Sequence, residues 1–100
     1  MKDLNISILF DYYGECLTDK QRELFDFYYN EDFSLAEVAQ NVGISRQGVR
    51  DSVKRTEQQL IEFENKLRLC EKTDTLKKMA EDLKEGKISQ QELLNYIENF

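Results

Sequence analysis

The stretch SLAEVAQNVGISRQGVRDSVKR, residues 34–55, decides the fold. It begins with Ser34-Leu35-Ala36-Glu37, a capping-box pattern in which a hydroxyl and a carboxylate satisfy free amides at the start of a helix. Gly43 can adopt the left-handed conformation that ends that helix, and Ser45 can cap the next one. The spacing predicts a helix-turn-helix unit, which is two short helices joined by a tight turn.

The apolar residues of this stretch fit the inside of such a unit. Ala39 is small where the two helices must approach closely, and we expect Ile44 and Val49 to fill the angle between them. Gly48 lies inside the second helix, where it costs about 1 kcal/mol relative to Ala. A close backbone approach to DNA or to another helix would explain this glycine, and so would simple tolerance.

Exposed positions along the second helix carry side chains that suit nucleic acid. Arg pairs with guanine and Gln with adenine, free N–H groups at a helix start suit a phosphate, and cations further on can hold the backbone. The alternative interpretation is a trihelical scaffold whose basic residues are solvated or paired with acids. The predicted nucleic-acid-binding residues are Ser45, Arg46, Gln47, Arg50, Lys54 and Arg55.

Outward from this stretch, apolar periodicity and capping residues predict an all-α fold. The chain has no Pro and only four Gly, which favours helices joined by short turns. We expect a helix-turn-helix domain over residues 1–72, which includes the long fourth helix, and a C-terminal helical hairpin over 73–100. The hairpin packs on that domain or on a partner. The six predicted helices run over about 3–13, 18–30, 34–42, 45–72, 74–85 and 89–100.

The long fourth helix carries an apolar seam with alternating spacings of four and three, as in a coiled coil. The favoured interpretation is a helix that lies along its own domain, on the first helix. The alternative is a homodimer, in which a second chain shares the seam. The seam consists of Val49, Val53, Leu60, Phe63 and Leu67, extended by Thr56 and Cys70.

Charge is unevenly placed along the chain. The formal net charge of −6 argues against a protein that coats nucleic acid indiscriminately. Residues 1–33 carry a net charge of −5 and residues 61–100 carry −2, whereas residues 34–60 carry +1. Any contact with nucleic acid is therefore expected at the middle segment.

Catalysis and metal binding are not expected. The chain has no His, no Gly-rich phosphate loop and no CxxC pair, and its two cysteines lie far apart. Carboxylates at one-turn spacing, such as Asp11 and Glu15, are typical of a solvated helix face. We predict a protein that is not an enzyme and that needs no cofactor.

The sequence also predicts a cytoplasmic protein. No apolar run approaches the roughly 20 residues that a membrane span requires. The N-terminal stretch MKDLNISILFDYYGE has acids on both sides of a short apolar segment, unlike a signal peptide.

Over residues 17–60 the chain resembles region 4 of bacterial sigma factors, and over most of its length it resembles the YlxM family of small bacterial proteins. Several blocks carry the second resemblance in order and at matching distances. They are Leu17-Thr18-Asp19-Lys20-Gln21, Tyr28-Tyr29, Asp32-Phe33-Ser34-Leu35-Ala36-Glu37-Val38-Ala39, Ser45-Arg46-Gln47-Gly48-Val49, Asp51 and Lys54-Arg55.

The resemblance implies a sigma-region-4-like helical fold and a role beside the signal recognition particle (SRP), because genes of the family lie next to those of the particle's GTPases. Two functional hypotheses follow. One is a regulator that binds DNA or RNA. The other is an accessory factor that binds an SRP protein or the SRP RNA and has no DNA-binding activity.

Overall fold

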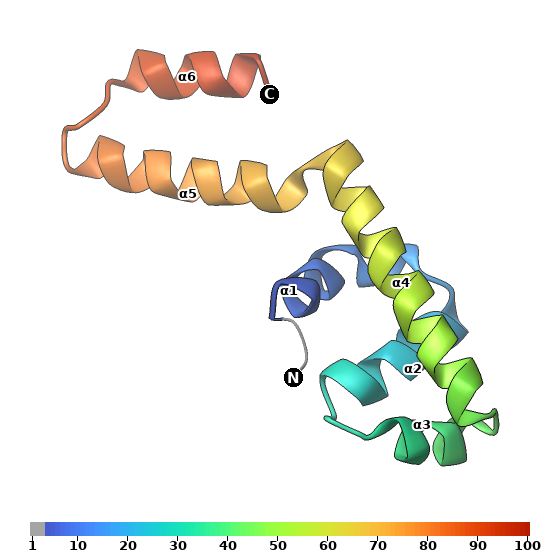
Figure 1. Ribbon diagram of the computed structural model, residues 1–100. Helices are drawn as coiled ribbons and strands as arrows, with labels where there is room; N and C mark the ends of the chain where they lie inside the picture. The colour runs from blue at the N-terminus through green and yellow to red at the C-terminus, as the bar shows by residue number, and fades with distance from the viewer. Residues whose placement is uncertain (1–3) are drawn as a thin grey trace. The chain divides into compact units, whose positions relative to one another are not determined.

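The computed structural model describes residues 4–100, which form six α-helices, one short 3-10 helix and no strand (Figure 1). The predicted all-α fold is confirmed, and the predicted start of the first helix at Asp3 lies outside the described residues. The helices are α1 (Leu4–Tyr13), η1 (Gly14–Cys16), α2 (Asp19–Tyr29), α3 (Leu35–Val42), α4 (Arg46–Leu67), α5 (Leu69–Lys84) and α6 (Gln90–Glu98).

Capping residues fix where α2 and α3 begin. Thr18 accepts a hydrogen bond from the Gln21 amide at 3.2 Å, and the Gln21 side chain accepts one from the Thr18 amide in return. Ser34 and Glu37 form the same reciprocal pair at the start of α3, at 3.1 and 3.0 Å. The capping box predicted at Ser34 is confirmed, and the one at Thr18 has the same form, because both depend only on residues within one helical turn.

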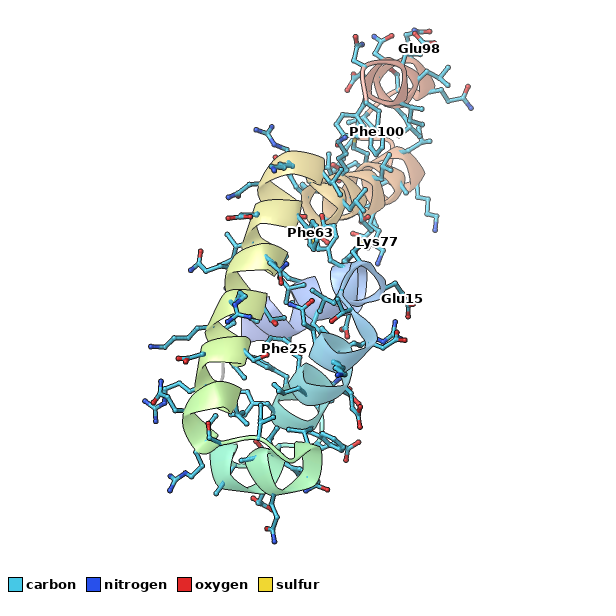
Figure 2. All side chains as sticks on the ribbon, turned by 90° about the vertical axis from the view of Figure 1, so that its right-hand side faces the viewer. Glu15, Phe25, Phe63, Lys77, Glu98 and Phe100 are labelled. Atoms are coloured by element: carbon cyan, nitrogen blue, oxygen red, sulfur yellow. The ribbon has the colours of Figure 1, made fainter. Side chains whose placement is uncertain are left out.

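The core of the first part of the chain lies where α4 crosses α1, α2 and α3. Phe25 is fully buried and lies between α4 and the N-terminal helices (Figure 2). Its ring centroid is 5.0 Å from that of Phe10 and 4.4 Å from that of Tyr29. The fully buried side chains with the largest volumes are Tyr13, Phe25, Leu60, Val38, Val49 and Thr56.

The apolar seam of α4 is part of this core. Three of its residues are buried within their own chain, namely Val49, Val53 and Leu60. The ring centroid of Phe63 lies 5.8 Å from that of Tyr13 on α1. Leu67, the last seam residue, is 47% exposed. The favoured intrachain interpretation therefore agrees with the structure. A homodimer through the whole seam is wrong, because α1 to α3 already enclose its first half.

The predicted continuous helix over 45–72 is also wrong. α4 ends at Leu67, and Arg68 adopts a left-handed backbone with φ of 54° before α5 begins at Leu69. An α-helix cannot continue through a residue in the left-handed region. Residues other than Gly seldom adopt that conformation. Cys70 therefore belongs to α5 and not to the seam.

The chain divides into two compact units, Met1–Leu67 and Arg68–Phe100, so the division lies at 67/68 and not at 72/73. In the second unit α5 and α6 pack on each other as a hairpin. Gly86 turns the chain with φ of 74°, and the ammonium of Lys72 lies 4.7 Å from the ring centroid of Phe100. Neither helix of the hairpin contains a buried residue.

Candidate nucleic-acid interface

The turn between α3 and α4 is held by backbone hydrogen bonds. Gly43 has φ of 75°, and the amides of Gly43 and Ile44 both donate to the carbonyl of Ala39, at 2.9 and 3.3 Å. Val49 fills the angle between the two helices and is fully buried, as predicted. The same prediction for Ile44 is wrong, because its side chain is 46% exposed at the turn.

Ser45 caps α4. Its hydroxyl accepts a hydrogen bond from the Gly48 amide at 3.0 Å, and its carbonyl accepts one from the Val49 amide at 3.0 Å. A Cβ atom on Gly48 would lie 3.2 Å from that hydroxyl oxygen. The close approach at Gly48 within the chain is therefore to the cap of its own helix, and the Ser45 hydroxyl already serves the fold.

Three predicted site residues form one line along α4. Arg46, Arg50 and Lys54 recur every fourth residue and are exposed, and we call them the basic stripe. Among residues 4–100, none of these three has an ion-pair partner. The structure thus brings together three unneutralised cations at the N-terminal half of α4.

Gln47 and Arg55 lie on a second line, beside the basic stripe. The Gln47 amide nitrogen donates a hydrogen bond to the Asp51 carboxylate at 2.9 Å, and Arg55 is exposed one turn further on. This bond uses one of the two N–H groups of the Gln47 amide, so pairing with an adenine would have to use the other N–H group and the carbonyl oxygen. Of the six predicted residues, Ser45 and Gln47 are therefore engaged within the chain, whereas none of the four cations has an ion-pair partner in the described part of the chain.

A hollow beside the basic stripe was not predicted. It lies between α2, α3 and α4 and has a volume of about 300 Å³, and we call it the side groove. Residues far apart in the sequence meet there, so no local pattern could have indicated it. The side groove is lined by Tyr28, Leu35, Arg50, Val53, Lys54 and Glu57.

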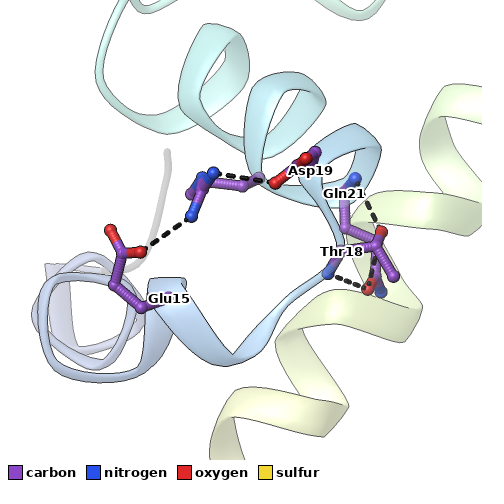
Figure 3. Close-up of polar contacts among 5 residues, drawn as sticks. Glu15, Thr18, Asp19 and Gln21 are labelled. Atoms are coloured by element: carbon purple, nitrogen blue, oxygen red, sulfur yellow. Dashed lines mark hydrogen bonds and ion pairs between the residues drawn. The ribbon is translucent and has the colours of Figure 1, made fainter.

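Arg22 of α2 forms ion pairs with one carboxylate of η1 and with one of its own helix. Arg22 reaches Glu15 at 3.0 Å and Asp19 at 2.9 Å (Figure 3). Glu15 and Asp19 are almost fully exposed, so these pairs contribute little to stability. They surround an acidic hollow of about 440 Å³ that Asp11 also lines.

No helix in the described part of the chain combines the length and the apolar character that crossing a membrane requires.

The fold and the turn define the class of protein, which is a helix-turn-helix protein. Over residues 1–100 the chain matches the family described as "UPF0122: Putative helix-turn-helix protein, YlxM / p13 like". The chain belongs to this family, as its resemblance to YlxM proteins indicated.

Curated relatives of similar length support the assignment. A UPF0122 protein of Caldanaerobacter subterraneus is 48% identical over 82 residues, which is 82% of this chain and 70% of the relative. One of Shouchella clausii is 43% identical over 90 residues, or 90% and 83% of the two chains. One of Halalkalibacterium halodurans is 41% identical over 101 residues, or 98% and 93%.

Proposed function

We propose that this protein is a regulator that binds duplex DNA through the N-terminal half of α4. The observation that carries the proposal is the exposed basic stripe, whose three cations have no acidic partner among the described residues. A helix-turn-helix inserts its second helix into the major groove with the N-terminus leading, and Arg46 stands at that end of α4. Family membership supports the same class of function.

The distribution of charge supports this site over others. Residues 1–33 are strongly acidic and would repel phosphates, whereas residues 34–60 are slightly basic. One helix-turn-helix makes few base contacts, so we expect weak binding on the order of 10⁻⁶–10⁻⁴ M at physiological salt. Tighter binding would need a dimer formed through a surface other than the buried half of the seam.

The first test is a titration of labelled random duplex DNA, followed by fluorescence anisotropy at low and moderate salt. Replacing Arg46 and Arg50 together by Ala should weaken binding about tenfold or more, because two phosphate or base contacts are lost. The matched control replaces Lys66 and Lys77 by Ala, which changes the net charge equally. Equal affinities of the double variant and the wild type would reject this site.

The second candidate is an accessory factor of the SRP pathway that binds a basic protein or ribonucleoprotein surface and no DNA. Its support is the family's implied role together with the acidic hollow near Glu15, which is complementary to a basic surface. Purified SRP protein and SRP RNA would be offered to the immobilised protein at low salt. Retention of either without any DNA binding would favour this candidate, and no retention would reject it.

A further inference from the structure

We infer that the side groove holds the sugar–phosphate backbone of the DNA, and that Arg50 acts there with Lys54 as a phosphate contact and not as a reader of bases. The inference rests on the proposed DNA binding and assigns separate tasks within the basic stripe. It also adds Leu35 and Tyr28 to the interface, on α3 and α2.

The side groove combines the two surfaces that a nucleic-acid backbone requires. Arg50 and Lys54 on its rim are exposed cations that can bind phosphate oxygens. Val53, which is buried, and Leu35, which is half-buried, give it an apolar wall against which a deoxyribose can pack. The ring of Tyr28 adds a third wall. It packs edge-to-face against the ring of Tyr29, with 5.4 Å between the two ring centroids.

One lining residue gives the side groove a direction. The carboxylate of Glu57 lies one turn beyond Lys54 and accepts a hydrogen bond from the hydroxyl of Tyr29. A phosphate would be repelled at that end and attracted at the end where Arg50 and Lys54 stand. The backbone is therefore expected to enter only as far as Lys54.

Helix dimensions support the division of tasks. Arg46 and Lys54 are separated by eight residues, which is about 12 Å along the axis of α4. The major groove is also about 12 Å wide. When Arg46 reaches the base edges, Lys54 lies at the margin of the groove where the phosphates run. Arg50 lines the same hollow as Lys54, so its guanidinium is placed to join that phosphate contact.

The test introduces a carboxylate into the side groove. Leu35→Glu places a negative charge at the first position of α3, where an acid also suits the helix start. Its matched control is Ala36→Glu, which adds the same charge at an exposed neighbour outside the lining. On the random duplex at low salt, Leu35→Glu should weaken binding about tenfold more than Ala36→Glu.

A second variant removes one exposed cation from the rim of the side groove. Lys54→Ala should weaken binding several-fold and reduce the slope of log K against log salt by about one. Lys66 is a cation in the last turn of the same helix, and Lys66→Ala should leave both the affinity and the salt slope unchanged. Circular dichroism would verify that each variant is folded.

The outcomes separate this inference from the proposed function. If the wild-type protein does not bind the duplex at low salt, the proposed function and the assignment of the side groove both fail. If it binds but Leu35→Glu matches Ala36→Glu and Lys54→Ala matches Lys66→Ala, the assignment fails alone. If the expected differences appear, the backbone lies in the side groove.

Discussion

At the scale of single residues, Gly48 lies close to the serine that caps its own helix. The sequence left open whether it served DNA, another helix or nothing. The structure places the Ser45 hydroxyl so close that a Cβ atom would meet it at 3.2 Å. That hydroxyl belongs to an exposed residue and can move by a few tenths of an ångström, so the contact is not a rigid obstacle.

Gly48→Ala should therefore stabilise the protein. Ala is favoured over Gly inside a helix by about 1 kcal/mol. The small shift of the Ser45 hydroxyl that makes room for the Cβ atom offsets part of this gain in stability. A net gain of about 0.5 kcal/mol corresponds to a rise in Tm of roughly 2–4 °C for a chain of this size. Thermal unfolding followed by circular dichroism would measure it, and a lower Tm would show that the Ser45 cap cannot move.

Residues whose roles are local could be predicted, and those whose roles depend on distant partners could not. The caps at Thr18 and Ser34 follow from a few neighbouring letters, and the exposed cations follow from helical periodicity. The exposure of Ile44 depends on how α2 and α3 pack around the turn. Tyr28 and Leu35 reach the side groove only because three helices converge there.

At the scale of elements, α4 connects the interface to the core. Heptad spacing correctly indicated an apolar line, but spacing alone cannot say whether the line faces the same chain or another one. The structure shows α1 to α3 covering its first half. The end of the helix before Arg68 could not be predicted from the sequence. A helix end is usually signalled by Gly or Pro, and here an arginine adopts the left-handed conformation instead.

Two leucines of the same seam test this assignment. Leu60→Ala should lower the free energy of unfolding by about 2–5 kcal/mol, because it leaves a cavity at a fully buried position. Leu67→Ala removes the same atoms at a half-exposed position and should change it by less than about 0.5 kcal/mol. Urea denaturation measures both. Similar losses at both positions would mean that the seam continues into an interface that covers Leu67.

At the scale of the whole molecule, the net charge of −6 opposes binding to DNA, and the basic stripe favours it. The overall charge slows the approach of a polyanion, whereas the stripe and Arg55 supply local contacts whose strength depends on released counterions. Composition alone would have suggested a protein that avoids nucleic acid. Only the placement of four cations on the exposed face of α4 supports the opposite view.

Binding should accordingly fall steeply with salt. If the four cations each neutralise one phosphate, log K should decrease with log salt with a slope of about −3 to −4. Anisotropy titrations over a series of potassium chloride concentrations would give the slope. A value near zero would mean that binding, if observed, does not involve these cations.

The unequal burial in the two units sets how quickly their backbone amides exchange with solvent. Amides in α4 beside Val53 and Leu60 lie in the enclosed core, so they become labelled only when the whole unit unfolds. Amides of α5 and α6 belong to helices without a buried residue, so brief local openings suffice for deuterium to enter. Arg68–Phe100 should therefore become deuterated long before the helix-turn-helix unit does, and any partner that covers the hairpin would slow that exchange.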